Sequence, residues 1–262
     1  MSYVLVILIA FLVGMEGILD EFQFHQPIVA CSLIGWACGY PGEGVVLGGT
    51  LQMITLGWAN VGAAVAPDAA LSSVTSAILM MKLLEHTTAV YVPMYLSILV
   101  AVPVSLVGLY LTKYCRNVAI GFVHNMDDAT QMADIPEVEK WHLLGIGMQG
   151  LRVVVVAVVL LLIPSKLLFG IYCALPAWVW DGAVVGGGMI TAVGYAIVVN
   201  MMSGAQTWPF FILGFFFATS NEFSLGALVA MGVAFALVFM MLKYRGGSAE
   251  SKDSLDEILN DY

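Results

Sequence analysis

Charged residues are scarce in this sequence. Only 10% of its 262 residues are Asp, Glu, Lys or Arg, whereas 61% are hydrophobic, and the mean hydropathy is +0.95. Ordinary soluble domains carry about 25% charged residues, so the composition excludes that class and predicts a polytopic membrane protein. With 9 Lys and Arg against 18 Asp and Glu, a nucleic acid is not expected as a partner.

The sequence also lacks the patterns of metal, nucleotide and disulfide sites. Its four cysteines have no metal-ligand or disulfide spacing, so buried, inert thiols are expected. Its four histidines form no pair at metal spacing, and there is no G-x-x-x-x-G-K-[ST] loop for a nucleotide. We therefore expect no metal, no other cofactor, and no ATP-driven transport by this chain alone.

Long apolar blocks are present instead. A transmembrane helix needs about 20 predominantly apolar residues, and four blocks approach that length: 4–19, 91–111, 151–169 and 223–242. Other apolar stretches are shorter or interrupted by Gly and Pro: 27–38, 45–59, 63–80, 183–202 and 209–219. In hydrocarbon, broken helices survive only where protein or a water-filled cavity surrounds them. The pattern therefore predicts transmembrane helices with broken or re-entrant segments around a cavity.

Basic residues cluster at two places and predict the orientation. They flank the polar connection 117–149 and follow the last apolar block, so both regions should face the cytoplasm. The connection is either a docking surface for a soluble partner or a solvated loop with a short amphipathic helix. We expect a transmembrane domain over 1–242 and an acidic, disordered cytoplasmic tail over 243–262.

The stretch "GWANVGAAVAPDAALSSV" contains a helix breaker and a carboxylate. From residue 45 to 81 only Asp68 is charged. Pro67 removes a backbone donor, and Asp68 would begin a second half-helix, whose positive end suits a polar ligand. An ionisable residue inside a membrane marks a functional site by default. The alternative is that Asp68 only caps a helix or pairs with a neighbouring donor.

A second polar cluster is "MEGILDEFQFHQP". Glu16 and Asp20 are four residues apart, hence on one helical face, and Gln23 and His25 follow. Carboxylates and amides together suit a neutral polyhydroxylated ligand, because each hydroxyl can donate to an acid and accept from an amide. The alternative is a helix end at the membrane surface. Gln52 and Asn60 are further candidates, for a ligand contact or for a helix–helix hydrogen bond.

Three motifs together resemble one family. They are "GILDEFQFHQP", "GGTLQMITLGWANVGAAVAPDAALSSV" and "GGGMITAVGYAIVVNMM", and they are similar to the IIC membrane subunit of mannose-family sugar phosphotransferase systems (PTS). The resemblance extends from about residue 1 to 242. It implies an all-α fold with a core (transport) domain and a scaffold domain. It also implies a multi-pass protein of the bacterial inner membrane.

The resemblance further implies partners and site residues. A IID membrane subunit would pair with this chain, in a trimer of IIC–IID pairs, and cytoplasmic IIA and IIB would carry phosphoryl groups to a hexose such as mannose or glucose. The phosphohistidine would be on IIB, so this chain would be non-catalytic on its own. Sugar contact is carried over to the matching positions Asp68, Asn60, Gln52, Gln23 and Asp20. "KLLEHTT" at 82–88 and the connection from 117 match no family motif.

A different class of protein is the alternative. In an ion-coupled secondary sugar transporter, Asp68, Asp20 or Glu16 would bind a proton or sodium ion. Composition and spacing alone do not separate this reading from group translocation, in which the sugar is phosphorylated as it enters.

Overall fold

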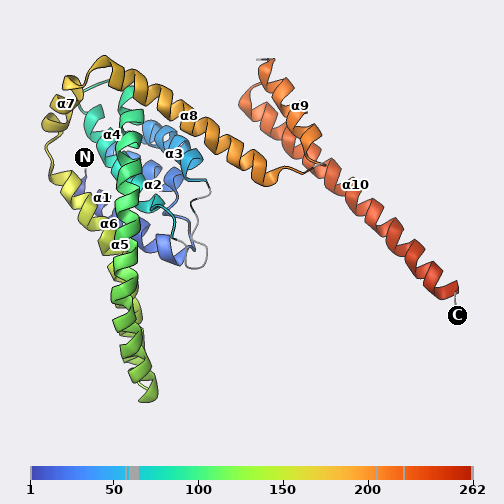
Figure 1. Ribbon diagram of the computed structural model, residues 1–262, viewed down its shortest axis with the longest axis horizontal. Coiled ribbons are helices and arrows are strands. Elements are labelled where there is room, and N and C mark those ends of the chain that lie inside the picture. The colour runs from blue at the N-terminus through green and yellow to red at the C-terminus, as the bar shows by residue number, and fades with distance from the viewer. Residues whose placement is uncertain (1, 57, 59–64, 205, 221, 261–262) are drawn as a thin grey trace. The chain divides into compact units, whose positions relative to one another are not determined.

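The computed structural model describes residues 2–56, 58, 65–204, 206–220 and 222–260, and within these ranges it contains ten helices and no strand. The chain divides into two units, 1–199 and 200–262. The helices of the first unit, shown in Figure 1, are α1 (Tyr3–Leu19), α2 (Pro27–Cys38), α3 (Pro41–Thr55), α4 (Ala69–Leu84), α5 (Tyr91–Gln131), α6 (Ile135–Leu162), α7 (Ser165–Ala174) and α8 (Ala177–Met202), the last of which ends in the second unit. The second unit also contains α9 (Trp208–Thr219) and α10 (Leu225–Asn260). The all-α prediction is confirmed.

Among the residues that the structure describes, four helices are long and apolar enough to cross a membrane: α5, α6, α8 and the segment Gly226–Lys243 of α10. The protein is therefore a multi-pass membrane protein. The predicted span 4–19 is not among these four helices. It forms α1, which has 17 residues and is about 25 Å long, shorter than the hydrocarbon core of about 30 Å. Five apolar helices are short: α1, α2, α4, α7 and α9.

Two predicted blocks are divided differently in the structure. The block 151–169 is not one span, because α6 ends at Leu162 and α7 begins at Ser165. Pro164 lies between them; it has no N–H to continue the helix and holds the preceding residue in an extended conformation. Conversely, 183–202 is not interrupted but lies within the continuous α8, since its glycines cost helix stability without breaking the hydrogen-bond ladder.

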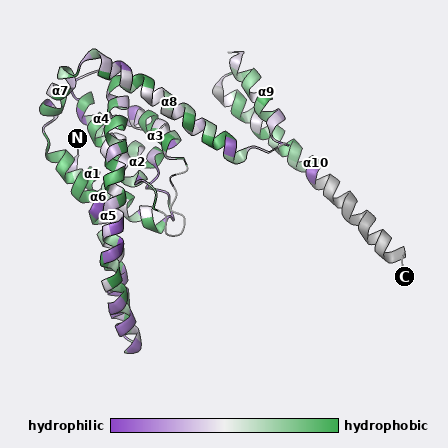
Figure 2. Cartoon of the chain, in the orientation of Figure 1, coloured by the Kyte–Doolittle hydropathy of each residue, from purple (hydrophilic) through white to green (hydrophobic). Residues whose placement is uncertain are grey.

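The connection 117–149 is not a solvated loop with a short helix. α5 continues to Gln131, α6 begins at Ile135, and the two form a helical hairpin that extends beyond the other helices of its unit (Figure 1). Asp134 caps α6 by accepting from the N–H of Glu137 at 3.3 Å, and Phe122 packs against Trp141 across the hairpin. Figure 2 shows that the protruding part is mostly hydrophilic, unlike the body of the unit.

In the structure, α10 continues through the acidic segment to Asn260, and the predicted disorder of this tail stays a prediction. Residues 249–260 contain no proline or glycine, so nothing in their backbone chemistry opposes a helix. The division of the chain at residue 242, and the split into core and scaffold domains, stay predictions.

The centre of the first unit is α4. Every residue from Ala70 to Leu84 is buried, and the helix packs against α2, α5 and α6. It contains one charged side chain, Lys82, which is 2% exposed. The ammonium group of Lys82 donates to the backbone carbonyls of Leu160, Leu161 and Ile163 at 2.9, 2.8 and 2.5 Å. A cation here satisfies carbonyls that the end of α6 leaves unpaired and opposes the negative end of its dipole.

Candidate functional site

Asp68 begins α4, as its position after Pro67 predicts. Its Oδ1 accepts a hydrogen bond from the backbone N–H of Leu71 at 3.0 Å, in the manner of an N-cap. Its own N–H donates to the carbonyl of Ser105 in α5 at 3.1 Å. The second half-helix is therefore confirmed, and its first residue is held by both its side chain and its backbone.

Arg152 of α6 forms an ion pair with Asp68, through guanidinium NH1 and carboxylate Oδ2. The two side chains are 4% and 7% exposed. Thr112 of α5 completes the cluster: its hydroxyl accepts from Arg152 at 2.6 Å and donates to Asp68 at 3.4 Å. Asp68 thus both caps a helix and pairs with a neighbouring donor, and its contact with a ligand stays a prediction.

Arg152 was not predicted as a site residue, because the sequence pattern showed it only as one of the basic residues that indicate orientation. A signal was available, because this arginine directly precedes the apolar run "VVVVAVVLLL". A charge at the edge of such a run needs a partner, and the apolar stretch 45–81 offers one carboxylate, Asp68. Sequence spacing could not show that Asp68 and Arg152, which are 84 positions apart, are in direct contact.

The close approach of α4 to α5 depends on Gly108. A Cβ atom at this position would lie 2.5 Å from the Cβ of Asp68 and 2.9 Å from Cδ2 of Leu71. Contacts this short do not occur between real side chains, so any larger residue would push the two helices apart. The glycine carbonyl also accepts from Arg152 at 3.5 Å.

A polar cavity of about 430 Å³ lies beside this ion pair. It is bounded by the N-terminal end of α4, the turn that follows α1, and the part of α5 and α6 where the protruding hairpin begins. The polar and charged residues that line it are Asp20, Gln23, His25, Gln26, Asp68, Thr112, Arg116 and Arg152. Three of the five predicted site residues, Asp20, Gln23 and Asp68, are thus brought to one cavity.

The other two predicted residues are placed differently. Gln52 is not among the residues that line the cavity; its amide donates to Oε1 of Gln26 at 2.7 Å. Asn60 lies outside the described residues. Glu16 is 5% exposed, and its carboxylate accepts from the N–H of Phe22 at 2.8 Å, so it holds the turn after α1.

The turn after α1 has an unusual backbone. Asp20 and Gln23 have positive φ angles of 54° and 59°, a region that is uncommon for residues other than glycine. Gln23 donates to Oδ1 of Asp20 at 2.6 Å and accepts from Gln26 at 3.0 Å. Uncommon conformations of this kind are often found at ligand sites, where surrounding contacts maintain them.

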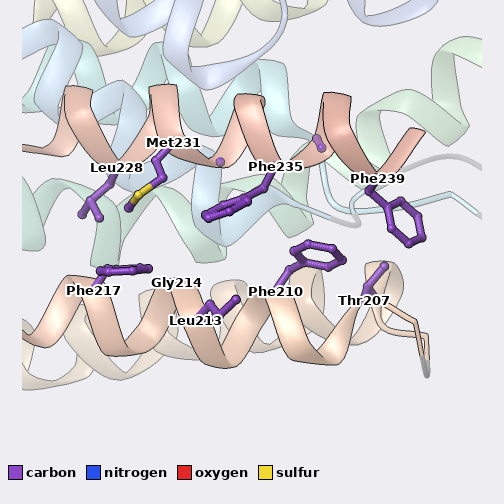
Figure 3. Close-up of a pocket in the computed structure, with 11 residues that line it drawn as sticks. Thr207, Phe210, Leu213, Gly214, Phe217, Leu228, Met231, Phe235 and Phe239 are labelled. Carbon is purple, nitrogen blue, oxygen red and sulfur yellow. The ribbon is translucent and has the colours of Figure 1, made fainter. Parts of the chain in front are cut away.

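A second cavity, in the other unit, has the opposite chemistry. It has a volume of about 310 Å³ and lies between α9 and α10. Figure 3 shows phenylalanines of both helices facing it, including Phe210, Phe217 and Phe235. Among the described residues of its lining, Thr207 is the one hydroxyl-bearing side chain. A ligand with many hydrogen-bonding groups fits the polar cavity and not this one.

In the part of the chain that the structure describes, no three His, Cys, Asp or Glu side chains are grouped as a metal ion requires.

The spacing at Gly108 predicts a local effect of substitution. Gly108→Ala should lower the stability of the purified protein by about 1–3 kcal/mol, because the added methyl group overpacks the α4–α5 contact. Gly121→Ala on the same helix is the matched control, since a Cβ there meets nothing within 4 Å. It should leave stability unchanged or raise it slightly. Thermal melting in detergent, followed by tryptophan fluorescence, measures both; equal melting temperatures would contradict the packing argument.

The buried ion pair predicts non-additive substitutions. Arg152→Gln should destabilise the protein by about 3–5 kcal/mol, because it leaves Asp68 buried and unpaired. Asp68→Asn should also destabilise it, through an unpaired Arg152, although asparagine can keep the N-cap. The double variant should melt at a higher temperature than either single variant. Strictly additive losses would show that the two groups do not depend on each other.

Comparisons with known proteins identify the family. Residues 1–238 match the family model described as the PTS system sorbose-specific IIC component. The chain is 39% identical to the mannose-specific EIIC component of Escherichia coli K12, over 92% of this chain and 89% of the relative. It is 40% identical to the sorbose-specific EIIC component of Klebsiella pneumoniae (90% and 87%) and 34% identical to the fructose permease IIC component of Bacillus subtilis (97% and 93%).

Two solved structures are similar over nearly the whole chain. One, described as "Structure of membrane protein", has a TM-score of 0.79 at 39% identity and covers 93% of this chain and 97% of its own. The other, described as "CryoEM Structure of Mannose Transporter ManYZ and Microcin E492 (MceA) complex", has a TM-score of 0.58 at 38% identity, with coverage of 92% and 94%.

These relatives give no support to an ion-coupled transporter, and the pairing of Asp68 with Arg152 argues in the same direction, because that carboxylate is already neutralised by a fixed cation. The chain belongs to the sorbose-type IIC family of the phosphotransferase system and is a sugar-translocating membrane subunit of such a system.

Proposed function

We propose that this subunit binds a hexose in the polar cavity beside Asp68 and presents it to a phosphoryl donor at the cytoplasmic face of a bacterial inner membrane. The observation that carries the proposal is the gathering of Asp20, Gln23 and Asp68 around one cavity of about 430 Å³. This volume lies in the range of about 300–1,000 Å³ that is typical of small-molecule sites.

The chemistry of the lining supports a neutral sugar. Asp20 offers acceptors, the side-chain amides of Gln23 and Gln26 offer both donors and acceptors, and Arg152 neutralises Asp68. A hexose has several hydroxyl groups, each of which donates one hydrogen bond and accepts others. A lining with mixed donors and acceptors satisfies them without the desolvation of an unpaired charge.

The position of the cavity supports delivery to the cytoplasm. Arg116 and Arg152 line it where α5 and α6 leave the body of the unit. Lys113 lies beside them on α5, and basic residues at the ends of spans favour the cytoplasmic side. The hydrophilic hairpin of α5 and α6 then extends into the cytoplasm, next to the proposed sugar site.

The partners follow from the family. A IID subunit would complete the membrane complex, in line with the two-component name of the ManYZ relative, and the assembly would be a trimer of such pairs. Phosphoryl groups would pass through IIA to a histidine on IIB, which would dock on the hairpin. The contribution of this chain would then be to position the sugar hydroxyl, as expected for a reaction whose rate depends on positioning. Direct contact of Asn60 with the sugar stays a prediction.

Inside-out membrane vesicles test the proposal. Vesicles that contain this chain with a IID subunit should convert labelled mannose, fructose or sorbose to sugar phosphate when phosphoenolpyruvate and the soluble carriers are supplied. Vesicles with only one of the two membrane subunits should form none. Free sugar that moves in response to a proton or sodium gradient, with no sugar phosphate formed, would overturn the proposal.

Variants of the cavity test its assignment. Asp20→Ala and Gln23→Ala should each raise KM for the sugar by about tenfold, because each removes a hydrogen bond of about 1–1.5 kcal/mol. Gln206→Ala is the control, since Gln206 is exposed and outside the cavity, and it should behave as the parent protein. The readout is the rate of sugar-phosphate formation at matched amounts of membrane protein. An unchanged KM in both cavity variants would move the sugar site elsewhere.

A further inference from the structure

We propose that Gln52 is a positioning residue: it fixes the direction of the hydrogen bonds in the sugar cavity through Gln26 and Gln23, and it does not touch the sugar. The inference rests on the proposed function, because it takes the cavity beside Asp20 as the sugar site. It assigns a different role to a residue whose sequence context predicts sugar contact.

Three side-chain amides form a continuous chain of hydrogen bonds, here called the amide relay (Gln52, Gln26 and Gln23). Nε2 of Gln52 donates to Oε1 of Gln26 at 2.7 Å. Nε2 of Gln26 donates to Oε1 of Gln23 at 3.0 Å. Nε2 of Gln23 donates to Oδ1 of Asp20 at 2.6 Å. The relay therefore connects α3 to the turn that follows α1.

The two ends of the relay determine its direction. At one end, the backbone N–H of Ile28 donates to Oε1 of Gln52 at 3.3 Å, and a backbone N–H can only donate. At the other end, the carboxylate of Asp20 can only accept while it is ionised. If any one amide rotated by 180°, two donors or two acceptors would face each other. One orientation of all three amides satisfies every link.

Two of the three relay residues line the cavity, and Gln52 is the one that does not. Gln23 and Gln26 line it together with Asp20. Among the described residues, none donates to Oδ2 of Asp20, so this oxygen is available for a sugar hydroxyl. The direction of the relay keeps the amide nitrogen of Gln23, and not its oxygen, against the carboxylate. Gln52 thus acts on the sugar site from α3, through two other side chains.

His25 lies beside the relay. Nε2 of Gln26 lies 3.1 Å from Nε2 of His25. The same Nε2 of His25 lies 3.6 Å from Oδ1 of Asp20. The imidazole of His25 therefore lies against both Gln26 and Asp20, beside the cavity.

The substitution Gln52→Glu leaves the relay without a consistent arrangement. The introduced carboxylate can only accept, so Gln26 must turn its nitrogen toward α3, and Gln23 must then turn its nitrogen toward Gln26. The oxygen of Gln23 would face the carboxylate of Asp20, and two acceptors would repel each other. Changing Asp20 to asparagine removes this conflict, because its amide can donate to Gln23 and the whole relay can run in the reverse direction.

A double-mutant cycle tests the inference. The parent complex, Gln52→Glu, Asp20→Asn and the double variant would be purified with the IID subunit. Binding of the sugar that the vesicles phosphorylate, with mannose tried first, and the melting temperature without sugar would be measured. We expect Gln52→Glu to weaken sugar binding by about two- to tenfold, the effect of one hydrogen bond, and to lower the melting temperature. In the Asp20→Asn background the same change should cost neither affinity nor stability.

Two further variants serve as controls. Gln206→Glu adds the same charge at an exposed position outside the cavity and should change neither readout. Gln52→Met removes the donor without adding an acceptor, so it should weaken sugar binding in both backgrounds, and Asp20→Asn should not rescue it. If Gln52→Glu alone does not fold, recovery of a folded, sugar-binding complex in the double variant supports the relay, and a double variant that also fails to fold overturns it.

The outcomes separate this inference from the proposed function. If Gln52→Glu costs the same affinity in both backgrounds while the cavity variants still impair sugar binding, the relay role is overturned and the sugar site stands. If Gln52 and Asp20 are coupled in the sugar-free melting temperature but the cavity variants bind sugar normally, the relay exists and the sugar site lies elsewhere.

Discussion

Two buried charges at the ends of one helix govern the arrangement of the first unit. α4 is enclosed by protein along its whole length, and it has a carboxylate, Asp68, just before its first residue and an ammonium group, Lys82, near its last. Both are bound to the same neighbour, α6: Asp68 to the side chain of Arg152, and Lys82 to the carbonyls at the end of α6. Because a buried charge without a partner is costly, α4 and α6 can slide past each other only by breaking one of these contacts.

The contacts of Asp68 and Lys82 with α6 help to explain why the polar cavity can exist beside hydrocarbon. The chain interrupts its helices before Asp68 and after α1, which leaves backbone groups and polar side chains at membrane depth. They are tolerated because protein surrounds them and because their hydrogen bonds are made locally: Asp68 with Leu71 and Ser105, and Glu16 with Phe22. The two acids of the cavity differ in consequence. Asp68 is engaged by its helix and by Arg152, whereas no described residue donates to Oδ2 of Asp20.

The two cavities of the structure differ in polarity. The first unit gathers acids, amides and arginines around a cavity next to the hydrophilic hairpin of α5 and α6, whereas the cavity between α9 and α10 is lined almost entirely by apolar side chains. Composition alone does not show which side chains gather at each cavity. What distinguishes them is which side chains meet across helices, such as Asp68 with Arg152 or Gln52 with Gln26.

The sequence by itself determined the membrane class, the all-α fold, the break at Pro67 and the start of a half-helix at Asp68. These features depend on local chemistry: the cost of charge in hydrocarbon, the missing N–H of proline and the preference of aspartate for a helix N-cap. Family motifs also pointed to Asp20, Gln23 and Asp68, which the structure brings to one cavity. The tertiary structure alone decided that Arg152 neutralises Asp68, that Gly108 permits their approach, and that Gln52 reaches the cavity through other side chains. Those contacts join residues 26 to 84 positions apart, and a local sequence pattern does not determine which distant faces meet when helices pack.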